Sequence, residues 1–227
     1  EQYLLLNQNP NKVELIIMGG TFNGFTLEYQ KEFITYAFKA MNDFSDLFYK
    51  EGNLDKEKFI KFFQLKKQFT SEARIKNIQN KILKLKGKTS LEKEHKRNEK
   101  AVVRVVGLTL ETRPDMITEA TTKFMLNLGA TRIELGTQSI YDDVLKKVKR
   151  GHLTDKTKNA IKILKDNGFK ILLHIMLGLP NSNRERDIKM FRELFSNPDY
   201  KPDMLKIYPC LVMQGTPLYQ DYIKGNY

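Results

Sequence analysis

Short apolar runs recur along the chain. They cover residues 13–18, 102–110, 131–135, 170–177 and 204–208, and each is apolar almost throughout instead of alternating strictly with polar positions. Strands that are covered on both faces, as in a parallel sheet, have this pattern. The runs therefore predict five buried parallel strands.

Between these runs, apolar residues recur at helical spacing. We expect helices over about 27–48, 115–128, 141–149, 154–167, 184–195 and 216–224. Two of them end at Leu128-Gly129 and Asn167-Gly168, where glycine suits a left-handed cap. The alternation of strand and helix predicts an α/β fold, with a parallel sheet or barrel and crossover helices.

A basic segment interrupts this alternation. Residues 54–100 hold fifteen Lys or Arg against six Asp or Glu, which is most of the net charge of +12. Apolar positions there predict two amphipathic helices, at about 56–69 and 71–86, followed by a polar segment at 88–100. Two interpretations stay open: a solvated helical face, or a surface for a polyanion, with nucleic acid ahead of an anionic membrane.

Composition narrows the functional classes. With 41% hydrophobic and 29% charged residues, the 227-residue chain has the profile of a folded domain. No apolar run approaches the roughly 18 residues that a membrane-spanning helix needs, and we read no signal peptide at the start, so a cytoplasmic location is expected. The single cysteine, Cys210, excludes an internal disulfide and any metal or iron–sulfur site held by several thiolates of these residues.

Polar residues and glycines gather directly after the predicted strands, where the ligand sites of parallel β/α folds lie. Gly19-Gly20 follows the first strand and either makes a tight turn or lets backbone amides approach a ligand. Glu111 comes at the end of the second strand. It either pairs with Arg113, with Asp115 capping the next helix, or accepts hydrogen bonds from a cationic ligand group.

His174 lies within the fourth predicted strand, and a histidine there is more often a satisfied core residue than a ligand. The sequence contains no phosphate-binding loop, dinucleotide fingerprint, serine-hydrolase elbow or zinc-protease motif. The residues alone therefore favour a ligand site on a β/α fold.

Three runs, at residues 18–22, 107–115 and 132–139, stand in an order that identifies a family. They resemble the radical S-adenosylmethionine domain of the Elongator catalytic subunit (Elp3) family of tRNA uridine acetyltransferases. The resemblance continues through Arg150-Gly151-His152 to Gly215-Thr216-Pro217-Leu218-Tyr219 and thins only in the basic segment.

The resemblance implies a partial parallel (β/α)6 barrel of the radical SAM type over residues 1–227, lacking its first, cluster-bearing strand and carrying a basic helical insertion at about 50–100. It implies S-adenosylmethionine and a 4Fe-4S cluster as cofactors, although the three cluster cysteines are absent from this chain. Acetyl-CoA would bind in an acetyltransferase domain that is also absent. We therefore expect a piece of a longer protein that is inactive alone.

The resemblance also assigns a cofactor site, residue by residue. The backbone of the glycine motif and Glu111 would face the amino group of the cofactor's methionine end, and Arg150 would pair with its carboxylate. Ribose hydroxyls and the adenine would meet side chains of the later strands. The residues concerned are Gly19, Gly20, Thr21, Glu111, Gln138, Arg150, His174 and Tyr208.

The implied reaction adds a carboxymethyl group, derived from acetyl-CoA, to C5 of the wobble uridine (U34) of tRNA. A 5′-deoxyadenosyl radical would abstract hydrogen from the acetyl group. The implied partners are tRNA and either other Elongator subunits or a second copy, with no membrane. The basic segment would then bind RNA through Lys61, Lys66, Lys67, Arg74, Lys76, Lys81, Lys84, Lys86 and Lys88. The alternatives are a non-catalytic RNA-binding or assembly module on the same fold, and a radical SAM enzyme with another substrate.

Overall fold

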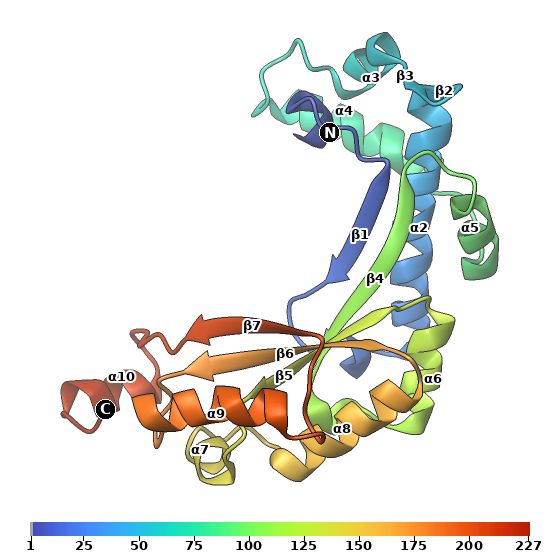
Figure 1. Ribbon diagram of the computed structural model, residues 1–227. Helices are drawn as coiled ribbons and strands as arrows, with labels where there is room; N and C mark the ends of the chain where they lie inside the picture. The colour runs from blue at the N-terminus through green and yellow to red at the C-terminus, as the bar shows by residue number, and fades with distance from the viewer. Residues whose placement is uncertain (1) are drawn as a thin grey trace. The chain divides into compact units, whose positions relative to one another are not determined.

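The computed structural model describes residues 2–227, which divide into two compact units. The first unit contains the residues up to Leu15 together with Phe25–Leu108, and the second contains Ile16–Gly24 and Thr109–Tyr227. Figure 1 shows the elements of both units in chain order.

A five-stranded sheet contains every long strand of residues 2–227. Its order follows the chain: β1 (Lys12–Ile17), β4 (Arg104–Thr112), β5 (Arg132–Gln138), β6 (Lys170–Leu177) and β7 (Met204–Pro209). The pairs β4–β5, β5–β6 and β6–β7 are parallel. The predicted α/β fold with parallel strands is confirmed, and the observed strands match the five apolar runs to within three residues at each end.

The register of these strands separates two kinds of side chain. Leu110, Ile133 and Ile171 stand in one row across β4, β5 and β6, and each is at most 1% exposed. The next row contains Glu111 opposite Glu134. Successive side chains of a strand point to opposite faces, so the apolar and the acidic row lie on different faces of the sheet.

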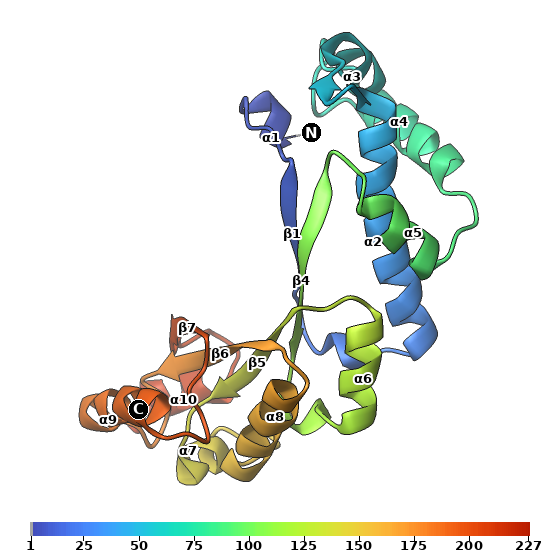
Figure 2. The ribbon, with the colours of Figure 1, turned by 45° about the vertical axis from the view of Figure 1, so that its right-hand side comes forward.

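In the second unit, helices follow each of β1, β4, β5, β6 and β7. Their bounds are η1 (Phe22–Gly24), η2 (Pro114–Met116), α6 (Glu119–Asn127), α7 (Asp142–Lys147), α8 (Thr154–Asp166), α9 (Arg184–Ser196) and α10 (Pro217–Ile223). Figures 1 and 2 show α8 and α9 on one side of β5, β6 and β7, and α8 packs against β6. The helix expected from residue 115 begins later, because Thr118 caps α6 and forms a capping box with Thr121.

The first unit is mainly helical. It contains α1 (Gln2–Leu5), α2 (Leu27–Phe48), the short antiparallel pair β2 (Tyr49–Lys50) and β3 (Asn53–Leu54), then α3 (Lys56–Phe63), α4 (Glu72–Leu85) and α5 (Leu91–Asn98). Its core forms around Phe48, Tyr49, Phe59 and Val103, with Phe62 and Phe63 packed against it. The first basic helix is shorter than predicted, because Gln64 adopts a left-handed conformation (φ 49°) and ends α3 at Phe63.

Helix α5 corrects the prediction of a polar segment at 88–100. Ser90 caps this helix, and Leu91 anchors it with 3% of its surface exposed. Glu94, which is 1% exposed, accepts hydrogen bonds from Asn42 on α2 and from Thr89, at 2.9 and 2.6 Å. Too few apolar residues mark α5 for its periodicity to be visible, and a polar network holds it instead.

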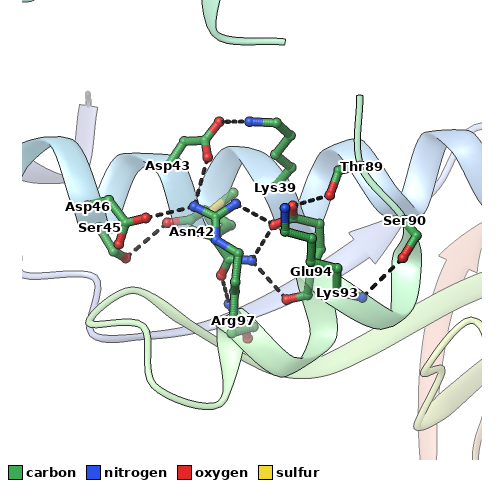
Figure 3. A network of polar contacts seen from close by, with 12 residues as sticks. Lys39, Asn42, Asp43, Ser45, Asp46, Thr89, Ser90, Lys93, Glu94 and Arg97 are labelled. Carbon is green, nitrogen blue, oxygen red and sulfur yellow. Dashed lines mark hydrogen bonds and ion pairs between the residues drawn. The ribbon is translucent and has the colours of Figure 1, made fainter. Parts of the chain in front are cut away.

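Figure 3 shows that network, which joins α5 to α2. Arg97 donates to Glu94 at 2.7 Å and to Asp43 and Asp46 of α2 at 3.0 and 2.7 Å. Burial alone would raise the pKa of Glu94, but hydrogen bonds from Thr89 and Asn42 and the charge of Arg97 outweigh it and lower that pKa. The network therefore replaces apolar packing as the link between the two helices.

Candidate cofactor site

The glycine motif forms a loop after β1 in the second unit. Gly19 and Gly20 have φ values of 111° and 124°, in the region that favours glycine. A Cβ atom at either position would meet nothing within 4 Å, so backbone conformation and not crowding requires glycine here. Thr21 follows, and its carbonyl oxygen accepts a hydrogen bond from the Gly24 amide at 2.9 Å, which turns the chain into η1.

Glu111 contacts this loop. Its Oε2 accepts a hydrogen bond from the Gly19 amide at 3.3 Å, while its Oε1 lies 3.6 Å from Nδ1 of His174. The alternative of a Glu111–Arg113 ion pair is wrong, because Arg113 donates to Asp115 instead, at 2.9 and 2.7 Å. The carboxylate of Glu111 therefore faces the glycine loop, where a cationic group would be stabilised.

His174 is buried on β6 and contacts a second carboxylate. Its Nε2 lies 2.8 Å from Oε2 of Glu134 on β5, and the ring of Tyr208 on β7 meets it edge to face at 5.7 Å. His174 is 5% exposed, so the description as a satisfied core histidine holds for Nε2. Its Nδ1 faces Glu111, which keeps this ring at the candidate site.

Glu134 and Lys206 were not among the predicted site residues. The Lys206 ammonium, on β7, donates to the same Oε2 of Glu134 that His174 contacts. Burial would raise the pKa of Glu134, but the hydrogen bonds from Lys206 and His174 outweigh it and lower that pKa. The spacing of Arg132, Glu134 and Gly136 at every second position of an otherwise apolar strand is the signal that could have identified this polar face.

Arg150 lies against β5. Its Nε and Nη2 donate to the carbonyl oxygen of Gly136 at 3.2 and 2.6 Å, and burial together with the charge of Arg113 lowers its pKa. A Cβ atom at Gly136 would collide with Nη2 of Arg150. A side chain at this position would therefore displace the guanidinium of Arg150.

Gln138 ends β5 at a register shift relative to β6, and its φ of 69° is left-handed. Its Nε2 would be 3.4 Å from a Cβ atom at Gly136, which places the amide beside Arg150. Its Oε1 is buried and has no hydrogen-bond partner among residues 2–227. A buried acceptor of this kind fits a ligand that brings a donor, such as a hydroxyl group.

All eight predicted cofactor residues thus lie in the second unit, and side-chain contacts join several of them. Glu111 contacts Gly19 and His174, and His174 contacts Tyr208. Gln138 and Arg150 meet at Gly136. The carboxylate of Glu111 suits a ligand's amino group, and the unpartnered amide oxygen of Gln138 suits a hydroxyl.

The predicted RNA-binding residues lie in the first unit and differ in exposure. Arg74 is 6% exposed and donates to the carbonyl oxygens of Phe63 and Phe69 at 3.0 and 3.5 Å, so its guanidinium holds the chain between α3 and α4. Lys81 donates to the Phe62 carbonyl oxygen at 2.9 Å, and Lys86 lies over the ring of Tyr36. The exposed members of the set are Lys61, Lys66, Lys67, Lys76, Lys84, Lys86 and Lys88.

Residues 2–227 contain no group of three or more His, Cys, Asp or Glu side chains placed to hold a metal ion. Nor does any helix in that range have the length and apolar character needed to cross a bilayer.

Comparison with known proteins identifies the family. The Radical SAM superfamily model matches residues 73–194. The tRNA uridine(34) acetyltransferase of Methanocaldococcus jannaschii is 41% identical over all 227 residues, which are 34% of that protein. Elongator complex protein 3 of Saccharomyces cerevisiae is 35% identical over the same 227 residues, or 33% of its length.

A solved structure, the archaeal Methanocaldococcus infernus Elp3 with an N-terminal deletion, superposes with a TM-score of 0.78 at 41% identity. The match covers 100% of this chain and 43% of that one. The chain spans about a third of the length of the curated relatives it matches. The predicted resemblance to the Elongator catalytic subunit is confirmed, and the chain belongs to the radical SAM superfamily.

Proposed function

We propose that this chain is the radical SAM core of a tRNA-modifying enzyme that adds an acetyl-CoA-derived carboxymethyl group to C5 of the wobble uridine, U34. Relatives named for tRNA uridine(34) acetylation or as Elongator complex protein 3 align with the whole chain and support this substrate. The observation that carries the proposal is the Glu111 carboxylate on the Gly19 amide, which marks an amino-group site beside the glycine loop.

The residues of the second unit fit S-adenosylmethionine. We assign its ammonium to Glu111 and the Gly19–Gly20 backbone and its carboxylate to Arg150, whose fork already donates to Gly136. The unpartnered Oε1 of Gln138 supports a contact with a ribose hydroxyl, and His174 and Tyr208 border the same face. When bound together with its cluster, this cofactor supplies radical hydrogen abstraction.

The chain's own part in the chemistry is binding, orientation and exclusion of water. Buried polar groups that find partners only in a bound ligand favour one ligand pose, because each would otherwise stay unsatisfied. Three cluster cysteines are not among the 227 residues, which contain one, so no cluster ligand is assigned here. Acetyl-CoA likewise has no site assigned within these residues.

The exposed lysines of the first unit are proposed to bind the tRNA backbone. Phosphate contacts of this kind supply affinity without reading sequence, while an unpaired wobble base can enter a pocket. A tRNA substrate supports a cytoplasmic location, and the names of the eukaryotic relatives support other Elongator subunits as partners. We keep the single barrel over residues 1–227, with the basic insertion at about 50–100, as a proposal about domain organisation.

A chimaera tests the proposed function. The 227 residues replace the matching third of the Methanocaldococcus jannaschii relative, and modified uridine is quantified by mass spectrometry of nucleosides from the substrate tRNA. We expect modification that depends on S-adenosylmethionine and is lost in the Glu111→Gln chimaera. A folded chimaera that carries its cluster but leaves U34 unmodified would refute the proposal, and retained tRNA binding in that case would favour the non-catalytic RNA-binding module.

A further inference from the structure

Four charged or titratable side chains form a continuous row of polar contacts across β4, β5, β6 and β7. Glu111 faces His174 at 3.6 Å, His174 contacts Glu134 at 2.8 Å, and Lys206 donates to Glu134. The register explains the grouping, since Glu111 stands opposite Glu134 and His174 stands opposite Lys206. One face of the sheet thus brings all four together.

The donor and the acceptor can be assigned for the contacts of Glu134 in this row. Glu134 is fully buried, and its low pKa keeps it ionised, so its oxygens can only accept hydrogen bonds. The Nε2 atom of His174 must therefore carry a proton to make its 2.8 Å contact with Glu134. In the neutral imidazole the other nitrogen, Nδ1, is then an acceptor, and it points to the side where Glu111 meets the glycine loop.

The Lys206 ammonium offsets the free-energy cost of burying the Glu134 carboxylate. A lone buried carboxylate is strongly unfavourable, and it would take a proton or draw one onto the imidazole. The Lys206 ammonium supplies the opposing charge directly on Oε2. The Nε2–H bond of His174 to Glu134 then leaves Nδ1 on the side of Glu111 and the glycine loop.

We propose that Glu134 and Lys206 are positioning residues for the cofactor site: together they hold His174 as the tautomer protonated on Nε2, so that Nδ1 accepts a hydrogen bond from a hydroxyl of the bound nucleoside. This inference rests on the proposed function for the identity of the ligand, S-adenosylmethionine. The tautomer itself is a property of the chain without ligand.

The test uses the chain labelled with 15N only at histidine, which the sequence holds at three positions: His95, His152 and His174. Loss of one imidazole signal in His174→Gln assigns the resonance. We expect a protonated Nε2 and an unprotonated Nδ1 for His174 at pH 7.5 in the absence of ligand. In Glu134→Gln, we expect the new amide oxygen to accept from Lys206 and the new amide NH2 to donate to Nε2 of His174. Nε2 must then be unprotonated, so the ring proton moves to Nδ1 and the tautomer inverts.

Lys206 is tested by a matched pair of variants. Lys206→Met should abolish the Nε2–H pattern of neutral His174, and Lys206→Arg should restore it. The control is Lys170→Met, which removes an exposed lysine from the Lys170–Asp203 pair of the same two strands and should leave His174 unchanged. Circular dichroism and thermal melting verify that each variant is folded.

Calorimetry with S-adenosylmethionine gives the second readout. We expect Glu134→Gln and Lys206→Met to weaken binding about tenfold, as for loss of one hydrogen bond to the ligand, with Lys206→Arg close to the parent. An Nδ1-protonated His174 in the parent chain, or unaltered imidazole signals in both variants, would overturn the inference. A parent with the expected tautomer, together with a cluster-bearing chimaera that has no affinity for S-adenosylmethionine, would instead count against the proposed function.

Discussion

The guanidinium of Arg150 occupies the space that a side chain at Gly136 would need. Two of its nitrogens donate to the Gly136 carbonyl oxygen, and a Cβ atom at that glycine would collide with Nη2. The strand and the arginine are thus fitted to each other at the candidate cofactor site.

Gly136→Ala should displace Arg150 and weaken S-adenosylmethionine binding by at least tenfold, with a loss of about 1–3 kcal/mol of folding free energy from overcrowding. Calorimetry and urea denaturation measure the two effects. Gly24→Ala is the control, because a Cβ atom there meets Thr21 only at 3.8 Å, an ordinary contact. Equal behaviour of the two alanine variants would contradict the crowding argument.

Arg97 should matter more for stability than an exposed ion pair between the same helices. Arg97→Met leaves the buried Glu94 without its guanidinium partner, and we expect a loss of about 2–4 kcal/mol in the free energy of unfolding. Lys31→Met removes the exposed Lys31–Glu92 pair, which also joins α2 to α5, and should cost less than about 1 kcal/mol. Chemical denaturation of both variants would show whether burial makes this difference.

The exposed lysines of the first unit should set the salt dependence of tRNA binding. Replacing Lys66, Lys67, Lys76 and Lys84 by Gln should weaken binding and lower the slope of log K against log[salt] by up to about 3, if each contacts one phosphate. Gln at the exposed Lys123, Lys146, Lys147 and Lys189 changes the net charge equally. If both quadruple variants lose the same affinity, the basic segment has no specific role and is a solvated face.

Reconstitution with iron and sulfide should give no stable 4Fe-4S chromophore on the 227-residue chain. A cluster needs several thiolates, and the sequence supplies only Cys210. Iron and sulfide analysis with the visible absorption spectrum provides the measurement. Four iron atoms bound per chain would show that other side chains of this chain act as ligands.

His152 should make the fold sensitive to mild acid. Its side chain is fully buried, and burial, with the nearby charge of Arg150, lowers its pKa in the folded chain. The unfolded chain therefore takes up a proton first as the pH falls below about 6.5, and stability declines from there downward until the folded pKa is passed. The contribution of this histidine to the stability of the fold is fully present only above a pH of about 6.5.

Thermal melting between pH 5 and 7.5 checks this behaviour. His152→Leu removes the titrating group, so the difference in unfolding free energy between the two proteins should change by up to about 1.4 kcal/mol per pH unit below 6.5. Parallel pH profiles for the two proteins would mean that His152 is protonated equally in both states.

The strands could be predicted because their apolar runs are long and separated by glycine-ended helices. The glycine loop and Glu111 could be recognised from their order in the sequence. Helix α5 could not, since Glu94 and Arg97 hold it by hydrogen bonds that leave no apolar period. The role of Lys206 was equally hidden, because its partner Glu134 lies 72 positions earlier and only the register of β5, β6 and β7 brings them together.

The opposition of Glu111 and Glu134 on adjacent strands also bears on how the sheet is assembled. Sliding β5 by a single residue would put the Glu134 carboxylate in line with Leu110 and Ile171, away from Lys206 and inside the apolar layer. Misaligned pairings would thus be penalised by an unneutralised charge. The ionic side chains that shape the ligand site therefore disfavour misaligned strand pairing during folding.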